Sequence, residues 1–291
     1  MFLSLEKNEL TLKSHLQRIA NILLINGGFS DSPGLYTGEM GLVLFFYRYA
    51  HYTQQNVYNE YACHLLEKTQ NLLHLDSPID YQQGLSGFGS AVEYLVQNGF
   101  VEADTDDILE DIDKRLFSFD KWPYLSLDEL LGIGQYALRR MAGDSVHTEM
   151  ILKKVLPRLV NCINEKCVNP EVEYRIVMFL KDMIETENPG MLSDMSIVFR
   201  PCRNRYPYGF EINTFNRYME QFSNNDFSYN NMFDLGLENG LSGFGMALLT
   251  ELDGDNSWIS LLPNDFIEHE LLYGSYPRIT RIITNSINRN S

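Results

Sequence analysis

The sequence lacks any stretch of the kind that crosses a membrane or directs export. No apolar run approaches the roughly 18 residues that a transmembrane helix needs. Residues 1–17, MFLSLEKNELTLKSHLQ, contain neither the basic nor the apolar segment of a signal peptide. We therefore expect a soluble, cytoplasmic protein without a membrane span.

Basic residues are scarce relative to acidic ones. Lys and Arg total 23 against 39 Asp and Glu, so the formal net charge is −16. This balance argues against a nucleic-acid surface and against binding to anionic membranes, whereas a basic peptide would be attracted. Much of the acid lies in residues 102–113, EADTDDILEDID, which we expect to form the solvated face of an outer helix.

Cysteine and strand-like patterns are also sparse. Four cysteines among 291 residues do not make a disulfide framework, so reduced thiols are expected. No alternation of apolar and polar residues is long enough to propose a sheet. Together with helical spacing of apolar residues along the chain, this absence predicts an all-α protein.

What the sequence does contain is a repeat. The hexapeptide GLSGFG occurs at residues 84–89 and again at 240–245, each time before an apolar run. Looser copies place Gly41 and Gly132 in register with Gly87, at spacings of 46 and 45 residues. Each copy predicts a tight turn that opens an inner helix, with glycines supplying positive φ or close approach of a neighbour. A phosphate-binding loop is the weaker interpretation, because the GxGxxG order and a following Lys-Ser/Thr are missing.

Between the glycine turns lie segments that predict outer helices. These segments are residues 12–26, 57–73, 104–117, 147–164 and 212–222, and a further inner helix without glycines is expected at 171–184. Each outer helix is expected to form a hairpin with the inner helix that follows it. The prediction is a single domain, residues 1–291, in which about five hairpins close into an α/α toroid. An irregular insertion at 188–210 and short helices after Asp253 complete it.

The repeat resembles a known family. Gly-Leu-Tyr-x-Gly-x-x-Gly at residues 34–41 and the repeated Gly-Leu-x-Gly-aromatic-Gly helices are similar to those of the lanthionine synthetase C-like proteins. The resemblance implies an α/α toroid related to the six-hairpin glycosidases. It also implies, for cyclising members, a zinc ion held by a Cys of one inner turn and a Cys-His-Gly sequence of the next, which activates a substrate thiolate.

The cysteines of this chain do not match that zinc-ligand pattern. Cys63-His64 is followed by Leu65 and falls in an outer helix, and Cys162 and Cys167 are separated by four residues. Cys202 lies in the 188–210 insertion, where a zinc site with distant histidines stays open. We expect no cofactor, and a zinc-less accessory that binds or modifies a peptide during ribosomal peptide maturation. The acidic net charge favours a basic peptide.

An enzyme is the alternative from a different class. A carbohydrate-active enzyme of the six-hairpin-glycosidase type needs two carboxylates facing each other across a cavity. The candidates near inner-helix N-termini are Glu39, Asp80, Asp128, Glu129 and Glu238, although carboxylates at such positions commonly cap helices. Three aromatic residues of the same loops could stack against a sugar or peptide side chain, or pack the rim: Tyr36, Tyr81 and Trp122.

Overall fold

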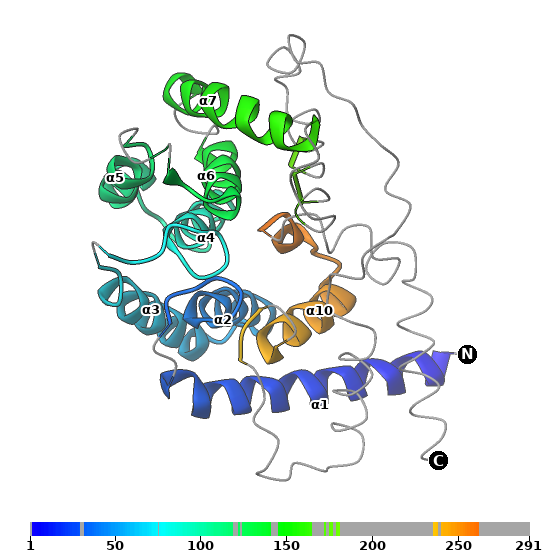
Figure 1. Cartoon of the computed structure of the whole chain (residues 1–291). Coiled ribbons are helices and arrows are strands. Elements are labelled where there is room, and N and C mark those ends of the chain that lie inside the picture. The colour runs from blue at the N-terminus through cyan, green and yellow to red at the C-terminus, as the bar shows by residue number, and fades with distance from the viewer. Residues whose placement is uncertain are drawn as a thin grey trace. The chain divides into compact units, whose positions relative to one another are not determined.

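The computed structural model describes residues 2–29, 32–74, 76–118, 122, 124–140, 145–164, 172, 175–176, 179–180, 235–237 and 240–261. This part of the chain is helical and contains no strand, which confirms the all-α prediction (Figure 1). The insertion expected at 188–210 and the outer helix expected at 212–222 lie outside the described residues. Of the short helices expected after Asp253, one is described, the 3-10 helix η4 (Ser257–Leu261).

The described residues fall into two compact units. Unit 1 contains residues 2–72 and 235–259, and unit 2 contains residues 73–180 and 260–261. Each unit has its own buried core of inner and outer helices. The single domain of residues 1–291 stays a prediction.

Unit 1 is built around α2 (Glu39–Thr53). This helix packs against both α3 (Asn56–Asn71) and α10 (Leu241–Asp253), and α10 in turn packs against α1 (Phe2–Asn26). A short 3-10 helix, η1 (Gly27–Phe29), follows α1. Segments from the two ends of the described chain therefore share one core.

Unit 2 contains the next helices of the chain. The helix α4 (Leu85–Gln97) packs against α5 (Thr105–Leu116) and α6 (Leu127–Arg140), and α6 packs against α7 (Ser145–Asn164). Part of the inner helix expected at 171–184 is described, because Ile176, Phe179 and Leu180 are helical and buried.

The helices α2 and α4, which were expected to be inner, are buried more completely than α3 and α5, which were expected to be outer. In α2 every residue from 39 to 50 is buried, and in α4 every residue from 85 to 95. The outer helices α3 and α5 each bury three residues: Ala62, Leu65 and Thr69 in α3, and Leu109, Ile112 and Leu116 in α5. A large apolar side chain stabilises the fold by about 1.5–3 kcal/mol when buried, so the inner helices carry most of this term.

The expected pairing of helices within each hairpin was wrong. In the structure α3 packs on the preceding α2, α5 on α4 and α7 on α6, whereas α1 packs mainly on α10. The reason is the length of the connections. Only residues 54–55 separate α2 from α3 and residues 141–144 separate α6 from α7, whereas residues 117–126 separate α5 from α6. A short connection forces successive helices to lie side by side.

The glycine that precedes α2 and the one that precedes α4 allow close approach of the backbone, the second of the two expected roles, whereas Ser126 precedes α6. Gly38 and Gly84 are the N-caps of α2 and α4, with φ of −114° and −112°, which any residue can adopt. A Cβ on Gly84 would collide with the carbonyl of Pro78, and one on Gly38 with the backbone of Gly34. The loop folds back so tightly over the helix start that no side chain fits there.

The third glycine of an inner helix packs under an aromatic ring of a neighbouring inner helix. In unit 2, a Cβ on Gly89 of α4 would lie 2.5 Å from the ring of Tyr136 on α6. In unit 1, Gly245 of α10 has the same relation to the ring of Phe45 on α2. Each ring belongs to the residue four positions after the second glycine of its own helix. We call these two neighbouring helix pairs the α4–α6 junction and the α10–α2 junction.

Two further contacts recur at both junctions. In the first, the second glycine of one helix lies against the loop that precedes the neighbouring helix. A Cβ on Gly132 of α6 would lie 2.9 Å from the amide nitrogen of Tyr81, and a Cβ on Gly41 of α2 would lie 3.0 Å from that of Leu237. Tyr81 and Leu237 each lie three residues before the first glycine of their repeat. The α10–α2 junction is therefore built like the junction between two consecutive repeats.

The third recurring contact joins the C-terminal ends of the helices. Ten residues after the second glycine of α4, Gln97 Nε2 donates to the carbonyl oxygen of Arg139 at 3.3 Å. At the same register of α10, Asp253 accepts from Arg48 at 3.1 Å. Arg139 and Arg48 both lie seven residues after the second glycine of their own helix.

Candidate functional site

The glycine turns use their own backbone to saturate the first amides of the inner helices. The amide of Glu39 donates to the Ser32 carbonyl at 2.8 Å, and the amide of Leu85 donates to the Pro78 carbonyl at 2.9 Å. At α10 the Ser242 amide and hydroxyl both reach the Leu235 carbonyl, the hydroxyl at 2.6 Å. Free amides are what binds a phosphate at a helix N-terminus. Their engagement here agrees with a packing role for the turn.

Glu39 is fully buried and tied to α3. Lys68 Nζ forms an ion pair with Glu39 Oε1, and Thr69 Oγ1 donates to Oε2 at 3.2 Å. Lys68 also donates to the Gly28 carbonyl at 3.0 Å. A buried carboxylate that is paired and hydrogen-bonded in this way joins α2 to α3.

Asp80 shapes the loop before α4. Its Oδ1 accepts the amides of Gln82 and Gln83, both at 2.9 Å, which makes an Asx-type turn. The backbone around Asp80 also lies against Gly132 at the start of α6. The side chain thereby holds the loop in the position that the α4–α6 junction requires.

Asp128 and Glu129 lie in the first turn of α6 and have different partners. Glu129 Oε2 accepts the Ser126 amide at 2.7 Å while Ser126 Oγ accepts the Glu129 amide at 3.2 Å, a reciprocal capping box. Asp128 accepts from Arg175 at 2.5 Å. The remaining candidate, Glu238, lies outside the described residues.

The three aromatic candidates are all buried. Tyr36, Tyr81 and Trp122 are 5%, 3% and 6% exposed. The Tyr81 hydroxyl donates to the Leu261 carbonyl at 2.8 Å, and Trp122 Nε1 donates to the Leu116 carbonyl at 3.2 Å. All three rings are covered, and the polar atoms of Tyr81 and Trp122 are hydrogen-bonded, so these side chains serve packing in the conformation described.

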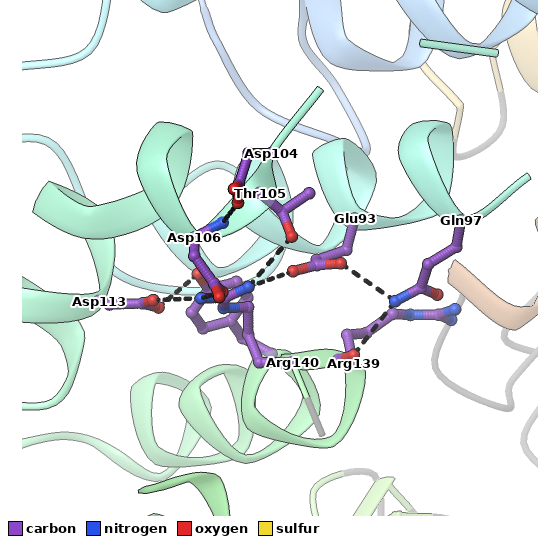
Figure 2. A network of polar contacts seen from close by, with 9 residues as sticks. Glu93, Gln97, Asp104, Thr105, Asp106, Asp113, Arg139 and Arg140 are labelled. Carbon is purple, nitrogen blue, oxygen red and sulfur yellow. Dashed lines mark hydrogen bonds and ion pairs between the residues drawn. The ribbon is translucent and has the colours of Figure 1, made fainter. Parts of the chain in front are cut away.

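Sequence reasoning missed the densest polar cluster, which surrounds Arg140 (Figure 2). The guanidinium of this buried residue donates to Glu93 at 2.6 Å and to Asp106 and Asp113 at 2.8 Å each. Thr105 accepts a further bond at 3.3 Å. The cluster joins α4, α5 and α6. The only sequence signal was an Arg and a Glu on helices that are otherwise apolar at the inner positions.

The Arg140 cluster is held in its charged form. Burial lowers the pKa of Arg140, but the hydrogen bonds that it donates to Glu93, Asp113 and Asp106 outweigh this effect, and the net pKa lies above its usual value. Burial raises the pKa of Tyr136, whose hydroxyl donates to Asp113 at 2.6 Å. Tyr136 and Arg140 therefore keep their protons at physiological pH, and their role is to fasten the helices together.

Glu251 near the end of α10 is the second residue that sequence reasoning missed. Burial raises its pKa to about 7. No sequence pattern distinguished it, because an acid near a helix end is usually solvated. A single carboxyl of raised pKa is one half of a glycosidase pair.

The described residues do not supply the zinc ligands that the resemblance implies. Cys63 and His64 are exposed on α3, and Cys63 Sγ lies 3.2 Å from the Tyr47 hydroxyl. Cys162 is half-buried on α7, whereas Cys167 and Cys202 lie outside the described part. Within that part, no three His, Cys, Asp or Glu side chains gather as a metal site. The described inner turns contain no Cys-His-Gly sequence of the kind that the resemblance implies for a zinc site.

A helix that spans a membrane needs about 20 predominantly apolar residues. Among the residues that the structure describes, no helix is long and apolar enough to span one.

Neither protein-family models, nor curated proteins, nor solved structures gave a match to this chain.

Proposed function

We propose that this chain is a lanthionine synthetase C-like protein whose hairpins close into an α/α toroid. The support for closure is the α10–α2 junction. It repeats three contacts of the α4–α6 junction: glycine under an aromatic ring, glycine against a loop amide, and a polar contact at the C-terminal ends. In an open solenoid, α10 and α2 would belong to distant repeats and would not pack on each other as consecutive repeats do.

We propose further that the protein binds a peptide as a zinc-less accessory of ribosomal peptide maturation. The observation that carries this proposal is the engagement of the described turn carboxylates. Glu39, Asp80 and Glu129 each hold a helix start or a neighbouring helix, so none stands ready as an acid or nucleophile. Binding without chemistry is the function that such a scaffold supports best.

The chemistry of the partner follows from charge. A net charge of −16 attracts a basic peptide over distances of about a Debye length, roughly 8–10 Å at physiological salt. We therefore propose a partner peptide with an excess of Lys and Arg.

A binding measurement with paired probes tests this function. A fluorescently labelled Lys-rich peptide and a Glu-rich peptide of the same length are titrated with the full chain, and anisotropy is followed at low and high salt. We expect the Lys-rich peptide alone to bind, with an affinity that falls about tenfold or more as salt screens the charges. Equal binding of both peptides, or of neither, would contradict the proposal.

The carbohydrate-active alternative has its own readout. The purified chain is incubated with a panel of oligosaccharides, and release of reducing sugar is measured. Release that Glu251→Gln or Glu39→Gln abolishes would make carbohydrate hydrolysis, and not peptide binding, the function of the protein. A gene neighbourhood that encodes a short leader-bearing peptide and a transporter would instead support peptide maturation.

A further inference from the structure

The two junctions share their apolar contacts but differ in their ionic ones. At the α4–α6 junction, Nη1 of Arg140 donates to Glu93 and Thr105, and Nη2 donates to Asp106 and Asp113. Both terminal nitrogens of this buried guanidinium are therefore engaged. The cluster is a saturated one.

The buried cation of the α10–α2 junction, Arg48, is less well satisfied. The side chain of Arg48 is 2% exposed, and its Nη2 donates to the two oxygens of Asp253 at 3.2 and 3.1 Å and lies 3.3 Å from Asp255. Its Nη1 is buried and has no hydrogen-bond partner among the residues that the structure describes. A buried N–H without a partner costs the free energy of its desolvation. We call Arg48, Asp253 and Asp255 the Arg48 clasp.

Solvent also reaches the acids of the clasp. The side chains of Asp253 and Asp255 are 25% and 46% exposed, so the clasp has no buried acid. In the Arg140 cluster Asp106 and Asp113 are 66% and 21% exposed, but Glu93 is only 5% exposed and pairs with Arg140 away from solvent. Water and salt can therefore compete for the clasp acids, and screening weakens their attraction to Arg48.

Chain connectivity makes the same junction the harder one to hold closed. Arg48 and Asp253 are 205 residues apart in the sequence, and Glu93 and Arg140 are 47 apart. Loop-closure entropy grows with the logarithm of loop length, so the longer loop closes about ninefold less readily by chain statistics alone.

We infer that the α10–α2 junction is the place where the folded molecule opens, with the Arg48 clasp as its latch. Opening here separates the last described inner helix from the first while the saturated α4–α6 junction stays closed. The latch is a property of the fold and is independent of which partner the protein binds.

Hydrogen exchange of the full chain, read by mass spectrometry, tests the latch. In the wild type we expect the amides of α10 to exchange faster than those of α4. Arg48→Met removes the clasp and should accelerate exchange in residues 241–253 by about tenfold or more, with residues 85–97 and 127–140 unchanged. The matched control is Arg140→Met, which removes the other buried cation and should leave α10 exchange unchanged.

Two outcomes would overturn the inference: unchanged exchange of α10 in Arg48→Met, or equal acceleration in α10, α4 and α6. Should Arg48→Met not fold, Asp255→Asn removes only the more exposed acid and the same comparison decides. In the wild type, raising salt to about 1 M should likewise accelerate α10 relative to α4, because screening acts on the exposed acids of the clasp. A uniform response to salt would argue against the latch.

Discussion

At the residue scale, the acidic side chains divide by what surrounds them. Glu39 has a lysine and a threonine, Glu129 has the backbone of a capping box, and Glu93 has Arg140. Glu251 has no such partner in the described residues, and burial alone raises its pKa to about 7. A carboxyl of this kind is destabilising when ionised, which makes the stability of the protein depend on pH.

The pH dependence has a definite sign. An unfolded Glu titrates near 4.5 and the folded Glu251 near 7, so the folded state loses stability relative to the unfolded state as pH rises between these values. Glu251→Gln removes the charge. We expect the variant to match the wild type near pH 4.5 and to be more stable at pH 8, by about 1–2 kcal/mol after allowance for partial exposure.

Urea denaturation of both proteins at the two pH values measures this difference. A Glu251→Gln variant that is equally stable or less stable than the wild type at pH 8 would show that the carboxyl has a stabilising partner.

At the scale of the element, the inner helices are specified by where glycine is required. Ala has a helix propensity better than Gly by about 1 kcal/mol, so a glycine in the middle of a helix needs a packing reason. Gly89 has one, since the Tyr136 ring covers it and cannot withdraw while its hydroxyl is bound to Asp113. Gly28 has none, because no neighbouring atom of the described residues lies within 4 Å of the position that its Cβ would take.

The two glycines therefore respond differently to the same substitution. Gly89→Ala adds a methyl group 2.5 Å from a ring carbon, and the resulting overpacking of about 1–3 kcal/mol outweighs the gain in helix propensity. Gly28→Ala, the matched control, should leave the free energy of unfolding within about 0.5 kcal/mol. Chemical denaturation decides the matter, and equal stability of the two variants would mean that the ring does not restrict Gly89.

Sequence reasoning recovered these elements because the repeat and the apolar spacing are local signals. The spacing of Gly41, Gly87 and Gly132 located the inner helices, and the outer helices followed from periodicity. The choice of partner for each outer helix was missed, although the two-residue connection after α2 already indicated it. Arg48 and Arg140 were missed because an Arg near a helix end is usually solvated, and only tertiary packing buries it.

At the scale of the whole molecule, closure of the ring requires that α10 pack on α2 as one repeat packs on the next. The hexapeptide GLSGFG could be recognised twice in the sequence, but no local signal says which helices its glycines meet. In unit 1 the answer is that Gly245 packs under Phe45, about 200 residues away, in the way that Gly89 packs under Tyr136. The proposed closure into a toroid builds on this equivalence.

A double-mutant cycle at this contact is the most direct measurement. Gly245→Ala pushes a methyl group into the Phe45 ring, and Phe45→Leu removes the ring, so each single change should destabilise the protein by about 1–3 kcal/mol. In the double variant, the methyl group added at position 245 occupies the space that the Phe45 ring has left. The equivalence predicts a double variant about 1–2 kcal/mol more stable than the sum of the single effects, as contacting residues show. Additivity within about 0.5 kcal/mol would mean that α10 does not pack on α2 as a repeat, and closure would lose its support.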